Sequence, residues 1–270
     1  MRVLVVRHHP EDSAGLVGSA FEERGAVVSS VLFPDGGPLP TPSSFDALVV
    51  LGAKWSVYDH ETIGSWIGSE LAWLRSADAE RVPVLGICFG AQALTAALGG
   101  TVSPSPRPEI GWTAVEPVSS RCLVGAGPWF QFHFDRCLPP AGAEVLARSA
   151  VCVQAFRLRR NLGLQFHPEV DASQLEGWLH NGCREIVLDA GLDPDELVVE
   201  TAAMEAAACE RARELVGMFV SEIAEGAGAG VPAWAHRSHS SPESSPQVQT
   251  PGPAARVATS SEGLRQNEHR

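Results

Sequence analysis

Residues 84–92 read Val84-Leu85-Gly86-Ile87-Cys88-Phe89-Gly90-Ala91-Gln92. A short apolar run that passes at once into a helix-type pattern predicts a buried strand, a tight turn and a helix. The two glycines that flank the cysteine allow a strained backbone and close packing at the turn. The helix N-terminus beyond it favours negative charge and offers backbone N–H groups. The segment therefore presents Cys88 as a candidate nucleophile at the apex of a strand-turn-helix unit.

The same alternation of strand and helix patterns continues on both sides of this unit. Strands are expected at residues 3–6, 27–33, 45–51 and 83–87, and helices at 14–24, 63–74 and 91–98. After residue 100, shorter strands in hairpins are expected at 110–118, 129–134, 144–149, 151–156 and 162–166, with helices at 172–181 and about 202–223. Alternating elements of this kind predict an α/β fold with a mostly parallel central sheet, helices on both faces and a small antiparallel addition.

Composition narrows the class of protein. The chain has 270 residues, 32 of them acidic against 20 basic, for a net charge of −12. A partner held by phosphate contacts, such as a nucleic acid, is not expected, because such proteins present basic surfaces. The 6 cysteines form no C-x-x-C pair, which argues against a disulfide framework or a metal site. With no secretory pattern and no apolar run long enough to span a bilayer, a cytoplasmic protein is expected, with no membrane partner.

The composition changes near residue 224. Residues 1–223 carry the periodic apolar patterns and are expected to form one domain. Residues 224–270 are dominated by Gly, Ser, Pro, Gln, Glu and Arg, and cannot bury enough apolar area to offset the entropy of ordering. A disordered tail is predicted there.

A second motif, Gln165-Phe166-His167-Pro168-Glu169, ends another apolar strand. Residues two apart on an extended segment share a face, so His167 and Glu169 are expected to point the same way. A thiol needs a base, and that base needs a partner that fixes its tautomer. Because parallel strands gather their sites at their carboxyl ends, we predict a catalytic triad of Cys88, His167 and Glu169.

The chain resembles the class I (triad-type) glutamine amidotransferases, and among them the free-standing, GMP-synthase-like group. The similarity covers roughly residues 1–222. It is carried by the two motifs above and by further segments: Ser56-Val57-Tyr58-Asp59, Glu109-Ile110-Gly111-Trp112, Arg148-Ser149 and Gln154-Ala155-Phe156. The resemblance implies a flavodoxin-like fold.

The resemblance also implies a reaction. Cys88 would attack the side-chain amide of glutamine, and His167, oriented by Glu169, would protonate the leaving ammonia and then activate water. Backbone N–H groups near Gly52 and at Phe89 would form the oxyanion hole. Gln92 and the segment from His133 to Asp135 would hold the amino-acid end of the substrate. No cofactor is implied, and the ammonia would pass to a synthetase or ligase subunit in trans.

Two segments depart from the family pattern. Gly52-Ala53-Lys54 stands where the family usually has Gly-Gly-Pro, and Phe132-His133-Phe134-Asp135 stands where it has Trp-His-Gly-Asp. No nucleotide-binding fingerprint is present. These departures keep two alternatives open. One is a hydrolase of γ-glutamyl peptides or amines that uses the same triad, and the other is a binding or regulatory subunit whose triad is vestigial.

Overall fold

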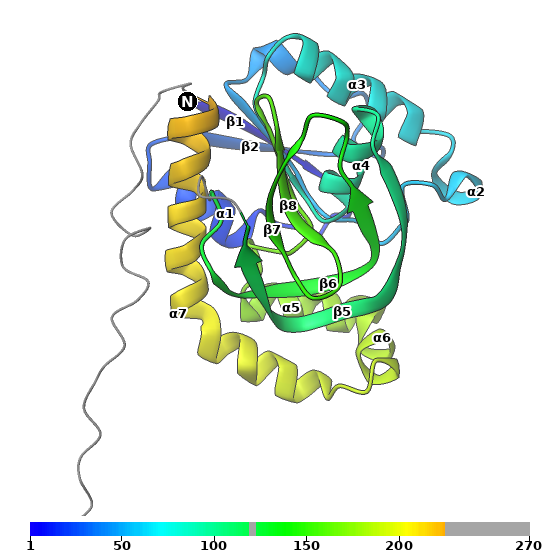
Figure 1. Cartoon of the computed structure of the whole chain (residues 1–270), viewed down its shortest axis with the longest axis vertical. Helices are drawn as coiled ribbons and strands as arrows, with labels where there is room; N and C mark the ends of the chain where they lie inside the picture. Colours follow the sequence, from blue (N-terminus) through cyan, green and yellow to red (C-terminus); the bar gives the residue numbers. More distant parts are fainter. Residues whose placement is uncertain (119–122, 225–270) are drawn as a thin grey trace, which may run out of the picture.

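The computed structural model describes residues 1–118 and 123–224 (Figure 1). The predicted domain of residues 1–223 falls almost wholly within this part of the chain. The tail predicted to be disordered, residues 224–270, lies outside the described residues except for residue 224.

The described residues form one nine-stranded sheet in the order β2-β1-β3-β4-β9-β8-β7-β5-β6. Its first five strands are parallel, and every pairing from β9 onward to β6 is antiparallel. This confirms the predicted α/β fold with an antiparallel addition. The strands are β1 (Arg2–Arg7), β2 (Val27–Leu32), β3 (Ala47–Val50), β4 (Val84–Ile87), β5 (Thr101–Pro117), β6 (Gly127–Leu138), β7 (Glu144–Arg148), β8 (Val153–Leu158) and β9 (Asn161–Leu164).

Helices cover both faces of the parallel part. One face packs against α1 (Gly15–Glu22) and α7 (Pro194–Met218), and the other against α3 (Ile67–Ala79) and α4 (Phe89–Ala97), as Figure 1 shows. Shorter helices are α2 (His60–Ile63), α5 (Ala172–Trp178) and α6 (Arg184–Asp189), with single turns at Pro42–Ser44, Leu179–Cys183 and Phe219–Ala224.

The two apolar layers follow from the period of two along a strand. In β1, Val3 and Val5 pack with the α1 and α7 side, whereas Leu4 and Val6 pack with the α3 and α4 side. A strand buried on both faces has no polar side, which is why its sequence reads as a continuous apolar run. A third, smaller cluster packs α5, α6 and the start of α7 against Phe130 of β6.

Three elements differ from the prediction. The helix expected over 63–74 is interrupted at Gly64 and Trp66, because Asp59 caps the separate helix α2. Strand β5 begins at Thr101, nine residues before the expected start, and its prolines lie where the register with β6 shifts between Pro104 and Glu109. Helix α6 was not predicted, and α7 begins at Pro194, well before residue 202.

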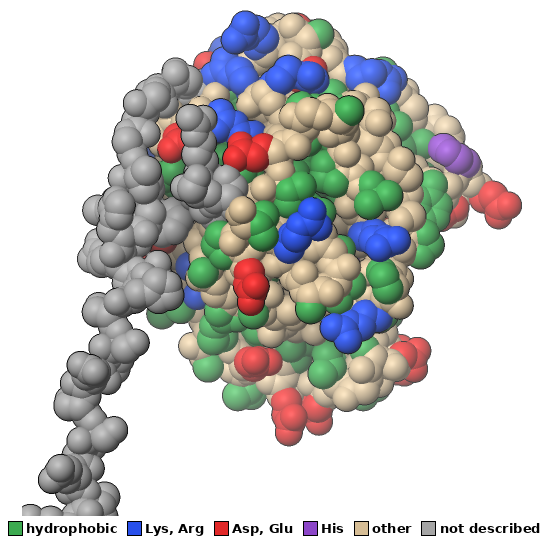
Figure 2. Space-filling view, in the orientation of Figure 1, with side chains coloured by type: hydrophobic (Ala, Val, Ile, Leu, Met, Phe, Trp, Pro, Cys, Tyr) green, Lys and Arg blue, Asp and Glu red, His purple; other side chains and the backbone are tan. Residues whose placement is uncertain are grey.

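The surface agrees with the acidic composition. On the face in Figure 2, Lys and Arg side chains gather toward the upper edge, and acidic side chains are spread over the middle and lower part. Over the described ranges 1–118 and 123–224, we find no helix with the length and apolar character that crossing a membrane requires.

Candidate active site

Cys88 occupies the turn between β4 and α4. Its backbone has φ +50° and ψ −107°, a conformation that non-glycine residues adopt only when the surrounding structure enforces it. The Cys88 N–H donates to Leu164 O at 2.7 Å. A Cβ at Gly90 would stand 2.1 Å from Val50 O, and one at Gly86 would stand 2.6 Å from Gly90 O. The two flanking glycines are therefore required by close packing.

The His-Pro-Glu segment reaches the same edge of the sheet because β9 lies beside β4 and runs parallel to it, with Leu164 opposite Ile87. The His167 N–H donates to Phe130 O at 2.8 Å, which ties the segment to β6. His167 Nδ1 lies 2.7 Å from Glu169 Oε1, and both side chains are buried. A carboxylate only accepts, so Nδ1 carries a proton, while Nε2 has no hydrogen-bond partner among the described residues.

The surroundings of His167 fix the ring. Trp178 contacts it edge-on, with ring centroids 5.0 Å apart and an interplanar angle of 71°. The Glu169 carbonyl accepts from the Leu16 N–H at 2.9 Å. Gly15 has φ +43°, and a Cβ there would stand 2.0 Å from Glu169 O, so the start of α1 packs directly on this segment.

The electrostatics of the pair favour an imidazolium. Burial alone would disfavour the charge, but the carboxylate of Glu169 and the thiol of Cys88 outweigh it and hold the pKa of His167 well above its usual value. A cation beside a thiol stabilises the thiolate, the form that acts as a nucleophile. The thiol itself lies 3.9 Å from Phe132 O, and Gln165 Nε2 donates toward its sulfur at 3.8 Å.

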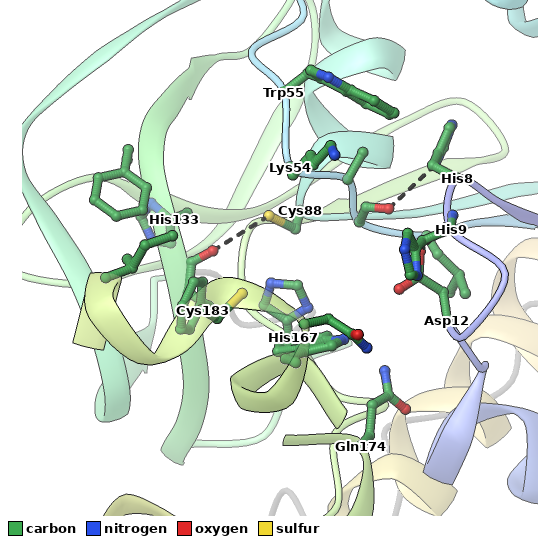
Figure 3. Close-up of a pocket in the computed structure, with 18 of the residues that line it drawn as sticks. His8, His9, Asp12, Lys54, Trp55, Cys88, His133, His167, Gln174 and Cys183 are labelled. Atoms are coloured by element: carbon green, nitrogen blue, oxygen red, sulfur yellow. Dashed lines mark hydrogen bonds between the residues drawn. The ribbon is translucent and has the colours of Figure 1, made fainter. Parts of the chain in front are cut away.

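These groups face one cavity of about 350 Å³ (Figure 3). The cavity is lined by predicted site residues and by residues that were not predicted. The predicted ones are Gly52, Cys88, Gln92, His133, Asp135, His167 and Glu169. The wall and mouth also include His8, His9, Asp12, Lys54, Trp55, Phe132, Phe134, Trp178, Asn181, Cys183 and Ile186.

The residues predicted for the oxyanion hole flank Cys88. A Cβ at Gly52 would meet His167 Cε1 at 3.1 Å and Cys88 Cβ at 3.7 Å, so the loop after β3 touches both side chains. Phe89 packs its ring in the core, and only its backbone, at the N-terminus of α4, belongs to the site. Gln92 is buried on the same helix, with its amide 3.5 Å from Gln165 Oε1.

Asp135 anchors the loop that follows Lys54. Its carboxylate accepts from Ser56 Oγ at 2.5 Å and from Tyr58 Oη at 2.6 Å. The sequence singled out Ser56 and Tyr58 only as part of a resemblance, without a role. In the structure they join the 53–58 loop to strand β6.

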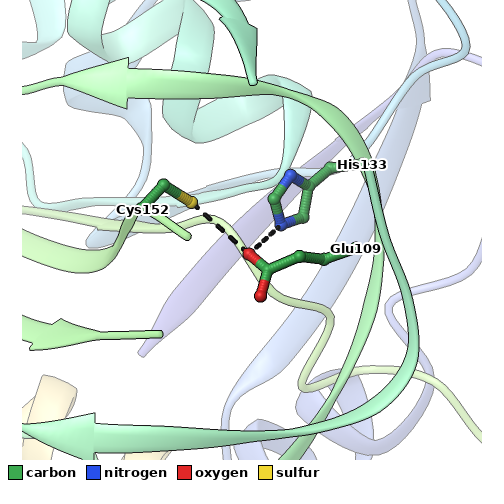
Figure 4. Close-up of side chains that lie close together, drawn as sticks. All are labelled: Glu109, His133 and Cys152. Atoms are coloured by element: carbon green, nitrogen blue, oxygen red, sulfur yellow. Dashed lines mark hydrogen bonds and ion pairs between the residues drawn. The ribbon is translucent and has the colours of Figure 1, made fainter. Parts of the chain in front are cut away.

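His133 turns its ring away from the thiol, toward a buried cluster with Glu109 and Cys152 (Figure 4). Its Nδ1–H donates to Asp135 O at 2.9 Å, and Nε2 lies 3.3 Å from Glu109 Oε2. Burial opposes the charge on Glu109, but hydrogen bonds from His133 and Ser149 outweigh it and lower the pKa of Glu109.

The Glu109, His133 and Cys152 ligand atoms lie within 4.8 Å of one another, a spacing that a metal ion could bridge. However, Ser149 and Gln154 donate to the same Glu109 oxygen at 2.9 and 2.8 Å. These donors occupy the lone pairs a metal would need, so the cluster fits a hydrogen-bonded network that braces β6 better than it fits a metal centre.

Sequence reasoning left His8 as a possible rim residue and passed over Glu70. In the structure His8 is 4% exposed, Glu70 is fully buried, and the two side chains are hydrogen-bonded beside Gly52. A signal was present, because Glu70 lies on the apolar face that Ile67 and Leu74 define on α3. An acid on such a face is rarely buried without a partner.

Comparisons with known proteins agree with this architecture. The family model for "Glutamine amidotransferase class-I" matches residues 19–185. A GMP synthase [glutamine-hydrolyzing] from Thermomicrobium roseum is 41% identical over 133 residues, which are 46% of this chain and 23% of that protein. The chain thus matches less than a quarter of that relative's length.

Two further proteins are similar over more of their length. The γ-glutamyl-L-1-hydroxyisopropylamide hydrolase of a Pseudomonas species is 29% identical over 187 residues, 62% of each chain. The crystal structure of a glutamine amidotransferase from Thermotoga maritima superposes with a TM-score of 0.75 and 27% identity, over 82% of this chain and 98% of that one. The chain belongs to the class I glutamine amidotransferase family.

Proposed function

We propose that this protein hydrolyses the side-chain amide of glutamine to glutamate and ammonia through a thioester on Cys88. The observation that carries the proposal is the geometry of one cavity. There, a strained cysteine lies beside a buried histidine whose far nitrogen is held by Glu169 at 2.7 Å.

In the first half of the reaction, the Cys88 thiolate attacks the amide carbon and forms a tetrahedral intermediate. The carbon–nitrogen bond then breaks, and the His167 imidazolium gives its Nε2 proton to the departing nitrogen, so that ammonia leaves. Glu169 holds Nδ1 and stabilises the charge on the ring while the proton is present.

In the second half, water attacks the thioester carbon. His167, now neutral, accepts a proton from that water at Nε2, the carbon–sulfur bond breaks, and glutamate departs. Nε2 has no competing partner among the described residues, which suits a nitrogen that exchanges a proton in both halves.

The negative oxygen that forms in each half needs donors already in place. The backbone N–H of Phe89, at the N-terminus of α4, and the peptide N–H after Gly52 flank Cys88 on two sides. For the amino-acid end of the substrate, we assign Asp135 to the ammonium group and Gln92 to the floor of the cavity. His133 braces the strand from behind, and a direct contact with substrate stays a prediction.

The ammonia is proposed to pass to an acceptor bound by a separate synthetase or ligase. This rests on the match to only 23% of the length of a GMP synthase, whose remaining sequence has no counterpart here.

The test measures ammonia and glutamate from purified protein and glutamine, with and without added lysate that supplies a partner. We expect equal amounts of both products, and a fall of at least about 10⁴-fold in Cys88→Ala. Cys209→Ala, on the outer part of α7, is the matched control and keeps full activity. Turnover by Cys88→Ala would refute the thioester route.

A second candidate, hydrolysis of N-substituted γ-glutamyl amides, is favoured by the mouth of the cavity. Trp55, Phe134, Trp178 and Ile186 line it, and such a surface suits an apolar leaving group better than ammonia. The similarity to a γ-glutamyl amide hydrolase supports the same idea. Comparing kcat/KM for glutamine and for γ-glutamyl isopropylamide decides between them, because the preferred substrate has the higher value.

A further inference from the structure

His8 and Glu70 form a buried pair that the reaction described above does not use. His8 ends the first strand region, and Glu70 lies on α3. His8 Nε2 lies 3.1 and 3.3 Å from the two carboxylate oxygens of Glu70, and neither side chain has measurable exposure. A buried carboxylate is expensive unless it is paired, so this contact has a purpose or a partner to satisfy.

The other ring nitrogen reaches the active site. His8 Nδ1 lies 3.2 Å from Gly52 O. A carbonyl oxygen only accepts, so Nδ1 is the donor, and Glu70 holds the opposite nitrogen and thereby fixes the orientation of the ring. In Figure 3, the accepting carbonyl lies between Cys88 and His8.

That hydrogen bond has a consequence for the far side of the peptide. In a planar trans peptide, the carbonyl of Gly52 and the N–H of Ala53 point in opposite directions. With the carbonyl held toward His8, the N–H faces away from His8, toward the side where Gly52 abuts Cys88 and His167.

His8 also touches the second donor of the proposed oxyanion hole. Its ring packs edge-on against Phe89, with centroids 5.0 Å apart, and stacks on Trp66 at 5.9 Å. One side chain therefore contacts both segments whose N–H groups flank the thiol. In a family whose usual sequence here is Gly-Gly-Pro, the rigid proline is replaced by Lys54, and a hydrogen bond can supply the rigidity that the proline would have given.

We propose that His8, held by Glu70, is a positioning residue that fixes the Gly52–Ala53 peptide so that its N–H is aimed at the developing oxyanion. The proposal rests on the hydrolytic function proposed above. His8 does not transfer a proton in the reaction; it acts through the peptide.

Two substitutions separate the two contacts of the ring. The amide nitrogen of asparagine can occupy the place of Nδ1, so His8→Asn keeps the donor to Gly52 and loses the contact with Glu70. The longer glutamine places its amide near Nε2, so His8→Gln keeps the contact with Glu70 and loses the donor to Gly52.

The two variants are expected to show opposite effects. For His8→Gln, we expect kcat to fall about 30- to 100-fold with KM almost unchanged, because the donor matters in the transition state. For His8→Asn, we expect kcat within about fivefold of the wild type, together with the larger loss of thermal stability, because Glu70 is left unpaired. Equal losses of kcat in both variants, or full activity in His8→Gln, would overturn the proposal.

A second readout does not depend on turnover. The ¹H–¹⁵N resonance of the Ala53 amide shares its peptide with the Gly52 carbonyl, so it is expected to move in His8→Gln and to stay near its wild-type position in His8→Asn. If the wild type hydrolyses no γ-glutamyl compound, the proposed function fails, and the Ala53 resonance still decides the positioning. An Ala53 resonance that moves equally in both variants would refute it.

Discussion

At the scale of single residues, the site depends on contacts that the sequence indicates only in part. Cys88 and His167 could be paired from sequence because each ends a strand of the same parallel sheet. The pairing of His167 with Glu169 could be predicted because residues two apart on an extended segment share a face. The contacts of His8 and Asp135 could not, since they join loops whose paths no periodic pattern encodes.

Glu169→Gln tests the electrostatic part of this arrangement. The pKa of His167 is raised, so the ring stays protonated beyond its unfolded value of about 6.5. The stability from this charge is complete below that value and is lost as the pH rises through the folded pKa. Removing the carboxylate lowers that folded pKa. We therefore expect unfolding free energy to fall less steeply above about pH 6.5 in the variant than in the wild type.

The same variant is expected to lose about 10²- to 10⁴-fold in kcat, since the tautomer is no longer fixed by a charged acceptor. Urea unfolding from pH 6 to 9 and steady-state kinetics measure the two effects. An unchanged pH dependence of stability would show that Glu169 does not stabilise the charged ring.

The cysteines offer a second test at this scale. Burial raises the pKa of Cys137 and of Cys152 to about 12, so at pH 7.5 fewer than about one in 10⁴ of these thiols is ionised. Burial also raises the pKa of Cys183. We expect iodoacetamide to label Cys88 before these three, as measured by peptide mass spectrometry over time. Earlier labelling of Cys152 would contradict the assignment of the reactive thiol.

At the scale of elements, the strand-turn-helix unit of β4 and α4 was readable because glycine spacing and apolar periodicity agree there. Strand β5 was not readable in full, because its prolines at 104, 106 and 108 resemble a loop. Only pairing with β6 on both sides of the register shift makes that stretch a strand. Helix α6 was missed because its six residues are too few to establish a period.

The close packing of this unit can be tested with a matched pair of glycines. A Cβ at Gly90 would stand 2.1 Å from Val50 O, whereas Gly68 on α3 has open space around the same position. We expect Gly90→Ala to lose about 1–3 kcal/mol or more of unfolding free energy, from forced displacement of the strand. Gly68→Ala is expected to gain about 0.5–1 kcal/mol from helix propensity. Denaturant unfolding measures both, and a neutral Gly90→Ala would contradict the geometry of the turn.

At the scale of the whole molecule, the sheet makes one edge out of many distant segments. The loops after β1, β3, β4 and β9 meet there, and the antiparallel strand β6 adds the wall that carries Phe132 to Asp135. The fold class followed from the alternation of patterns along the chain. The shape of the cavity did not, because it depends on where α5 and α6 close over that edge, with Trp178 and Ile186 facing inward.

A chain that ends after residue 224 tests the domain boundary. The three apolar clusters of the described part draw their residues from Val3 to Ile223, so the packing that holds the sheet and its helices together is complete by that point. We expect the shortened protein to unfold within about 2 °C of the full chain, since a loss of 1 kcal/mol would already lower the midpoint by about 2–4 °C at this size. Its kcat for the preferred substrate is expected to match that of the full chain, because every residue that lines the cavity lies between His8 and Ile186. Calorimetry and steady-state kinetics on both lengths measure this. A lower midpoint would mean that residues beyond 224 pack on the domain, and a lower kcat at the same midpoint would mean that they act on the site.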